Sequence, residues 1–243
     1  LVGNPGTGKT TVARILAKIY KALGILERGH IVETDRQGLV AGFVGQTAIK
    51  TSEKIDEALS GVLFIDEAYA LSNFNGLQGD FGNEAIQTLL KRMEDMRGKF
   101  FVIVAGYPDN MEVFLKANPG LSSRFDKTLK FKDYSPAELE SIGHSMLKDE
   151  GYSLSPGARD ALHNVLKDMY HKRDKYFGNA RDVRKIILEI IKNQNLKLAS
   201  KPQNVRKKNQ QFIIQEEDLS TLSLIREAEL TDKKTIGFRS RDN

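Results

Sequence analysis

The residues best suited to chemistry stand at the start of the chain. Residues 3–10, GNPGTGKT, fit the phosphate-loop pattern G-x-x-x-x-G-K-S/T at every fixed position. Glycines in such a loop let consecutive backbone N–H groups point into one concavity that holds a polyphosphate. The competing interpretation is a glycine-rich turn that caps an ordinary helix. The residues predicted to contact the nucleotide here are Asn4, Pro5, Gly6, Thr7, Gly8, Lys9, Thr10 and Thr11.

Within this loop, two side chains have distinct expected tasks. Lys9 is expected to reach the β- and γ-phosphates, and Thr10 to offer its hydroxyl to Mg²⁺. The helix that begins here directs the positive end of its dipole at the bound anion.

A pair of acidic residues follows a run typical of a buried strand. Residues 61–65 are continuously apolar, and Asp66 and Glu67 come directly after them. Strands buried on both faces are typical of parallel sheets, which bind ligands at their carboxyl edge. We expect Asp66 to hold Mg²⁺, directly or through water, and Glu67 to orient and deprotonate an attacking water. The alternative is a helix N-cap followed by an acid in the first turn.

The segment of residues 41–45, AGFVG, sets Phe43 and Val44 between two glycines, ahead of a helix predicted over residues 47–60. Such a loop exposes its aromatic side chain, or else Phe43 packs into the core as a hydrophobic staple. The local sequence leaves both interpretations open.

Two later positions could contact an anion. Tyr107 follows a strand predicted over residues 100–105, beside the acid-bearing strand, where a polar side chain could sense the γ-phosphate. Asn179 is expected to cap a helix whose first turns carry Arg181 and Arg184. Arginine at a helix amino end opposes the macrodipole, which suggests an anion there, although a solvated charged face explains the pattern equally well.

These residues require alternating strands and helices. Val12, Ile15, Leu16, Ile19 and Leu23 recur at helical spacing and predict a helix that carries the phosphate loop and ends at Gly24. Strands are predicted over residues 30–34, 61–65, 100–105 and 129–131, with a turn at residues 118–120. Leu1 and Val2 are expected to end a strand that begins upstream. Right-handed crossovers then predict a three-layer α/β domain with the parallel sheet of a P-loop NTPase over residues 1–131.

After residue 131 the pattern becomes helical. A capping box at Ser135 and Glu138 opens a helical domain predicted over residues 132–200. Residues 201–243 are predicted to be a linker, polar and basic over residues 201–211, and a tail, with a short strand at residues 212–214.

Composition narrows the class of protein. The chain has 243 residues and no cysteine, which excludes disulfides and thiolate metal sites and fits a reducing compartment, here the cytoplasm. No apolar run approaches the roughly 20 residues of a membrane-spanning helix. The net charge is +5, but Lys and Arg are spread along the chain, so we expect a solvated basic surface and no nucleic-acid partner.

Together these motifs resemble the AAA+ ATPases. The resemblance rests on residues 3–10, residues 62–67, the arginine of SSR at 122–124 and GNAR at 178–181. Within that class, FVGQTA at 43–48, LFIDEAY at 63–69, AGY at 105–107, NPG at 118–120 and IGF at 236–238 look like the CbxX/CfqX family. That family includes red-type rubisco activases, a sporulation stage V protein K and type VII secretion ATPases.

The resemblance implies ATP and Mg²⁺ as cofactors and assigns further roles by position. Phe43 and Val44 would form the pore loop, Arg124 the arginine finger that acts in trans, and Arg181 the lid sensor. The first sensor, usually Asn, falls at or near Tyr107, which is a departure from the broader pattern.

The expected function is a Mg²⁺-dependent ATPase that assembles as a ring, with a hexamer expected, and pulls on a protein partner. A small-molecule kinase shares the phosphate loop, but Glu67 directly after Asp66 and the helical lid argue against it. A DNA-handling loader or initiator lacks a visible DNA-binding motif here. An ATP-bound scaffold that barely hydrolyses is the third alternative.

Overall fold

The computed structural model describes residues 1–43, 45–72, 81–200 and 212–220. Val44, residues 73–80, the predicted linker at residues 201–211 and the tail beyond residue 220 lie outside these described residues. The chain divides into two compact units, Leu1–Asp133 and Tyr134–Asn243, and each is described by itself.

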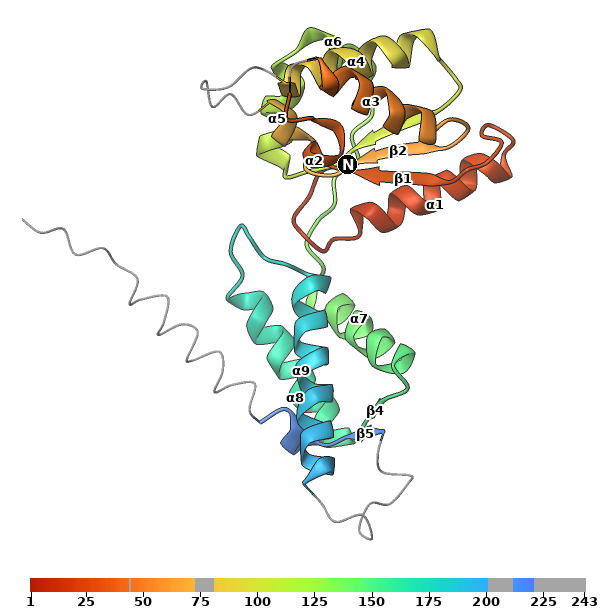
Figure 1. Ribbon diagram of the computed structural model, residues 1–243. Helices are drawn as coiled ribbons and strands as arrows, with labels where there is room; N and C mark the ends of the chain where they lie inside the picture. The colour runs from red at the N-terminus through yellow and green to blue at the C-terminus, as the bar shows by residue number, and fades with distance from the viewer. Residues whose placement is uncertain (44, 73–80, 201–211, 221–243) are drawn as a thin grey trace, which may run out of the picture. The chain divides into compact units, whose positions relative to one another are not determined.

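The first unit alternates strands with helices (Figure 1). Its elements are α1 (Lys9–Ala22), β1 (Ile31–Thr34), α2 (Arg36–Leu39), α3 (Gln46–Glu57), β2 (Val62–Ile65), the 3₁₀ helix η1 (Ala68–Ser72), α4 (Phe81–Asp95), β3 (Phe101–Val104), α5 (Pro108–Lys116) and α6 (Pro119–Arg124). The second unit contains α7 (Pro136–Asp149), β4 (Ser153–Leu154), α8 (Pro156–His171), α9 (Ala180–Ala199), β5 (Ile213–Ile214) and the 3₁₀ helix η4 (Glu216–Asp218).

A parallel sheet with strand order β1-β2-β3 forms the centre of the first unit. Val2 continues it beyond β3 through parallel bridges to Gly106 and Lys130. The predicted strand over residues 129–131 is therefore wrong in extent. Within the described chain Val2 alone bridges this segment, with its N–H donating to Leu129 at 2.9 Å and its carbonyl accepting from Phe131 at 2.8 Å.

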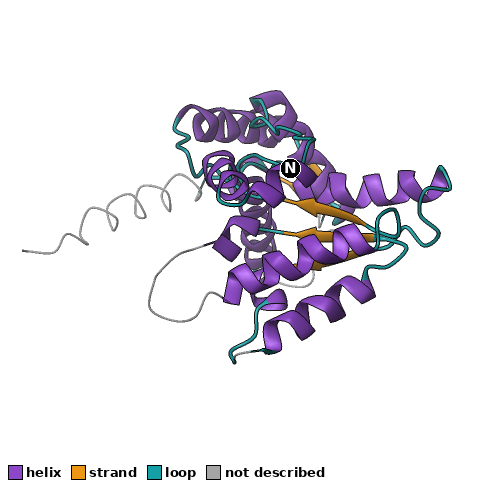
Figure 2. Cartoon of the chain, turned by 90° about the horizontal axis from the view of Figure 1, so that it is seen from above, coloured by secondary structure: helices purple, strands orange, loops and turns teal. Residues whose placement is uncertain are grey.

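Helices cover both faces of this sheet, as Figure 2 shows. The alternating side chains of β2 decide which helix meets which face. Phe64 packs in one cluster with Ala13 of α1, whereas Leu63 and Ile65 pack in another with Ile55 of α3. A strand buried on both faces explains its uninterrupted apolar sequence, and the predicted three-layer α/β fold is confirmed.

The predicted helix before Gly24 is present as α1, and its buried side is formed by small residues. Ala13 and Ala17 are the buried residues, at 0% and 1% exposure, while Ile15, Ile19 and Leu23 are 49%, 44% and 66% exposed. Small side chains let the helix backbone approach the sheet closely. The larger apolar residues, spaced four apart, then fall on the opposite side of the helix.

The segment predicted as a turn at residues 118–120 instead begins α6. Asn118 caps this short helix by accepting the N–H of Gly120 at 2.8 Å, and Pro119 occupies the first helical position. The helix places Arg124 at its last position, so the backbone before this arginine is held by a regular element.

The second unit packs its three longer helices around one apolar core. Leu139 of α7, Leu162 of α8 and Ile187 of α9 are buried in this core. The predicted capping box of α7 is confirmed, because the Ser135 N–H donates to Glu138 at 2.7 Å while the Ser135 hydroxyl accepts the Glu138 N–H. The predicted strand near residue 213 is also confirmed, since β5 pairs in parallel with β4.

The predicted side-chain cap of α9 is wrong. Asn179 occupies the N-cap position with φ 49°, but its side chain makes no cap hydrogen bond. It is fully buried, and its amide instead accepts the N–H of Tyr134 at 2.9 Å and donates to the carbonyl of Phe177 at 3.2 Å. The positive φ of Asn179 turns its side chain toward neighbouring segments. Its hydrogen bond with Tyr134 therefore joins the residues just before α7 to the start of α9.

Candidate nucleotide-binding site

The backbone of the predicted phosphate loop adopts the conformation that its glycines permit. Gly6 and Gly8 have φ of 69° and 90°, in the left-handed region that other residues rarely enter. Gly8 is the N-cap of α1 and offers no side-chain cap, and no acid stands in the first turn of the helix. The amino end of α1 therefore presents N–H groups and a positive dipole end to an anion.

Side chains of the loop hold it in shape from within. The Lys9 ammonium donates to the carbonyls of Gly3 and Asn4, each at 2.8 Å, and so lies inside the curve of the loop. The hydroxyl of Thr7, which is buried, donates to the same Asn4 carbonyl at 2.8 Å. These three hydrogen bonds fix the curve of the loop from its inner side.

A contact that the sequence did not reveal anchors the loop from outside. The Asn4 amide donates to the Asp133 carboxylate at 2.9 Å, across 129 positions of sequence. Gly3 lies so close to Phe131 that a Cβ on it would stand 2.6 Å from the Phe131 carbonyl oxygen. Only glycine fits there, and the segment 131–133 is therefore a supporting wall of the loop.

The acidic pair and the loop flank the same strand end. The N–H of Gly3 donates to Gly106 at 3.2 Å, on one side of the segment that follows β3. On its other side, the N–H of Ala68, just after the acids, donates to Ala105 at 3.1 Å. Parallel strands lie about 4.8 Å apart, so the loop and the acids stand about 10 Å from one another across β3. The sheet therefore brings these two sequence motifs to one edge.

Glu67 has a φ of 51°, which is left-handed and rare for a residue with a side chain. The Asp66 carboxylate accepts the Glu67 N–H at 3.1 Å, a span of one residue that differs from the two or three residues of a helix N-cap. The helix-cap interpretation is thus not supported. Backbone strain of this kind costs roughly 1–3 kcal/mol and clusters at functional sites.

Tyr107 lies at the strand end between these two motifs. It is the N-cap residue of α5 but makes no side-chain cap hydrogen bond. Its ring centroid lies 6.4 Å from that of Tyr69 in η1, so the aromatic pair borders the segment that follows the acids.

The remaining predicted residues stand on other elements. Phe43 is 72% exposed, which excludes its role as a core staple. Arg124 donates to the Glu94 carboxylate of α4 at 3.2 Å. Arg181 is exposed in the first turn of α9, in the second unit.

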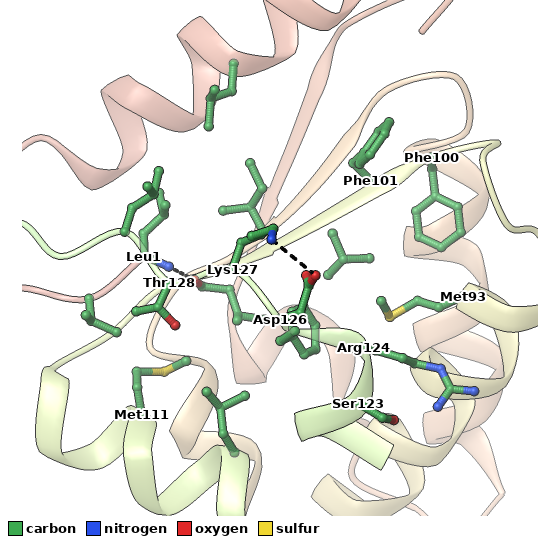
Figure 3. Close-up of a pocket in the computed structure, with 18 of the residues that line it drawn as sticks. Leu1, Met93, Phe100, Phe101, Met111, Ser123, Arg124, Asp126, Lys127 and Thr128 are labelled. Atoms are coloured by element: carbon green, nitrogen blue, oxygen red, sulfur yellow. Dashed lines mark hydrogen bonds and ion pairs between the residues drawn. The ribbon is translucent and has the colours of Figure 1, made fainter. Parts of the chain in front are cut away.

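A cavity of about 570 Å³ occupies a different part of the first unit (Figure 3). Leu1, Phe101 at the start of β3, and the segment 123–129 line it, whereas no residue of the phosphate loop does. It is therefore separate from the candidate nucleotide site.

Each of the two units matches a known protein family. Residues 1–133 match the family described as "ATPase family associated with various cellular activities (AAA)", and residues 135–229 match the AAA lid domain. No helix among the described residues is long and apolar enough to cross a membrane.

Several curated proteins are similar along most of the chain. Stage V sporulation protein K of Bacillus subtilis (strain 168) is 42% identical over 219 residues, which span 90% of this chain and 67% of that protein. A CfxQ homolog of Guillardia theta is 41% identical over 217 residues, 89% of this chain and 73% of that protein. The chloroplastic ribulose bisphosphate carboxylase/oxygenase activase of Cyanidioschyzon merolae is 39% identical over 217 residues, which span 89% of this chain and 73% of that protein.

A solved structure of a Thermotoga maritima RuvB mutant has a similar fold, with a TM-score of 0.62 at 19% sequence identity. The match covers 93% of this chain and 62% of that one.

Proposed function

The chain belongs to the AAA family of ATPases, and within it to the CbxX/CfqX family, and on that premise we propose that it hydrolyses ATP with Mg²⁺ in a ring that remodels a protein partner. One observation carries the proposal. A glycine loop with a lysine inside its curve and a pair of acids meet at the carboxyl edge of a single parallel sheet, on either side of β3. This is the edge where parallel sheets bind ligands.

Binding of the triphosphate is assigned to the loop. Its backbone N–H groups, with the amino end of α1, would hold the phosphate oxygens. The Lys9 ammonium, which donates to the Gly3 and Asn4 carbonyls inside the loop, would add its charge to the β- and γ-phosphates.

The donor set also fits Mg²⁺. Thr10 and Asp66 offer hard oxygen ligands, which Mg²⁺ prefers, and would hold it while it neutralises phosphate charge. Among the described residues no group of three or more His, Cys, Asp and Glu side chains could hold a metal by itself. A site with only one or two protein ligands is typical of Mg²⁺, because phosphate oxygens and water molecules supply its remaining ligands.

Hydrolysis is assigned to Glu67 and Arg124. The Glu67 carboxylate would orient a water molecule and accept its proton as the oxygen attacks the γ-phosphorus, and its left-handed backbone sets the direction of the side chain. Arg124 would act on the nucleotide of a neighbouring subunit, as head-to-tail rings permit. Arg181 and Tyr107 would report the state of the γ-phosphate from the lid and the sheet.

The partner is proposed to be a protein, gripped by the loop that carries Phe43. The exposure of this aromatic supports the proposal, because an apolar side chain in solvent can hold a chain without touching phosphate. One relative is named as an activase of an enzyme, which agrees with action on a folded protein.

Two variants test the proposed chemistry by separating binding from turnover. Lys9→Ala should lose nucleotide binding, whereas Glu67→Gln should bind ATP normally and turn it over about 10²-fold more slowly. Lys116→Ala and Glu112→Gln, which break an exposed ion pair on α5, are the matched controls. Turnover is measured without any acceptor or DNA. Hydrolysis by Glu67→Gln at the parent rate would show that another group is the base.

A further inference from the structure

Arg124 does not extend freely from its helix. Its Nη2 donates to a Glu94 carboxylate oxygen at 3.2 Å, and its Nη1 lies 3.5 Å from the carbonyl of Gly120, at the limit of a hydrogen bond. The side chain is 29% exposed. Figure 3 shows it extending from α6, past Met93, away from Asp126 and Lys127 at the centre of the view.

Glu94, at the end of α4, holds a second arginine as well. Nη2 of Arg97 donates to the two Glu94 oxygens at 2.9 and 3.1 Å. One carboxylate thus lies between two guanidinium groups, and the three side chains together keep a net positive charge. Arg124 is therefore oriented by Glu94 without being neutralised as a cation.

The donors of Arg124 that remain suit an oxyanion. A guanidinium carries five N–H donors, of which each amino group supplies two. Glu94 and Gly120 engage one donor on each amino group, and Nε is buried with no partner among the described residues. One N–H on each amino group is thus left for a phosphate oxygen while both protein contacts persist.

We propose that Glu94 is a positioning residue for Arg124, which it holds in the orientation that meets the nucleotide of a neighbouring subunit. The inference rests on the proposed trans role of Arg124. Stability alone is a weak reason for the pair, because exposed ion pairs contribute about 0–1 kcal/mol. Orientation is a stronger one, because a misplacement of about 1 Å in a catalytic group can cost about 10²-fold in rate.

Steady-state ATP hydrolysis by the full protein tests the proposal. Glu94→Ala should lower kcat about tenfold and leave KM for ATP and the binding of a fluorescent ATP analogue unchanged, because the subunit's own pocket is intact. Glu94→Gln should retain part of the rate, since its amide oxygen still accepts a hydrogen bond. Glu112→Gln removes a comparably exposed, paired carboxylate on α5 and should keep the parent rate.

Mixing subunits then shows which side of the interface is defective. Glu94→Ala should regain activity when mixed with Glu67→Gln, because the Glu67→Gln subunit supplies a correctly held Arg124 to the intact pocket of the Glu94→Ala subunit. It should gain nothing when mixed with Arg124→Ala, because both variants then have an impaired arginine finger. Co-assembly is checked by light scattering and folding by thermal unfolding. A general loss of structure would not sort the variants into these two groups.

Each remaining outcome counts against a specific statement. If Arg124→Ala and Glu67→Gln restore each other but Glu94→Ala groups with Glu67→Gln, the trans finger stands and the role of Glu94 is overturned. A rise in kcat for Glu94→Ala and Glu94→Gln would likewise overturn it, because Glu94 would then restrain the arginine. Parent activity in Arg124→Ala would overturn the trans role proposed for Arg124 and this inference with it, whereas the assignment of ATP hydrolysis to the phosphate loop and Glu67 would stand.

Discussion

Replacing Phe43 by alanine should abolish the remodelling of a protein partner while changing the stability of the folded protein only slightly. Phe43 is 72% exposed, so about a quarter of its surface is buried. With about 200 Å² for a phenylalanine side chain, roughly 50 Å² is withdrawn from water, which at about 25 cal/mol/Å² contributes about 1 kcal/mol. Area estimates of this kind are upper bounds, so Phe43→Ala should lower the free energy of unfolding by about 1 kcal/mol or less.

Phe114 of α5 supplies the matched control. It is 1% exposed in the core of the first unit, and Phe114→Ala should cost about 3–5 kcal/mol. Urea unfolding of both variants measures the difference. The chain has no tryptophan, so Phe43→Trp also provides a single fluorophore whose emission should resemble that of the indole in water.

The functional arm of the same experiment uses ATP hydrolysis and the action on a partner. Phe43→Ala should hydrolyse ATP within a few-fold of the parent rate and fail to remodel its protein partner, because the side chain grips a chain and does not touch phosphate. A loss of stability equal to that of Phe114→Ala, or a buried emission from Phe43→Trp, would refute the reasoning and place Phe43 in the core.

Three further outcomes follow from single contacts. Gly8→Ala should weaken ATP binding and cost about 1 kcal/mol in urea unfolding, because φ is 90° there. Thr51→Val should cost about 1–3 kcal/mol in the same assay, since the buried Thr51 hydroxyl donates to the Leu39 carbonyl at 3.0 Å. The N–H and then the hydroxyl of Ser135 lower the pKa of Glu138. Its stabilising effect is therefore present above its unfolded pKa of about 4.3 and lost as pH falls through the lower folded value, so the Tm difference between parent and Glu138→Gln should vanish in acid.

Local patterns in the sequence were sufficient for the motifs and most elements. The phosphate loop, the acids after an apolar run and the capping box of Ser135 and Glu138 each depend on residues within a few positions of one another. For such local patterns, the number of positions between two residues is enough to tell how they lie relative to one another within a helix, strand or loop. For the same reason the strands at 31–34, 62–65 and 101–104 were predicted nearly to the residue.

Patterns alone could not decide which side of an element is buried. Helical spacing in α1 marks an apolar stripe at Ile15 and Ile19, but the sheet accepts the side with Ala13 and Ala17, where small side chains allow close packing. The local sequence likewise does not decide whether Phe43 is buried in the core or exposed to solvent. Such choices depend on the shape of the surface opposite, which no local window contains.

Contacts between distant positions were also beyond the sequence. Asn4 meets Asp133 across 129 positions, Arg124 meets Glu94 across 30, and Asn179 turns from its expected cap to the N–H of Tyr134. Local sequence patterns are enough to identify the groups that could bind phosphate and activate water. The side chains that hold those groups in place are visible only in the folded chain, because a hydrogen bond depends on positions in space that packing defines.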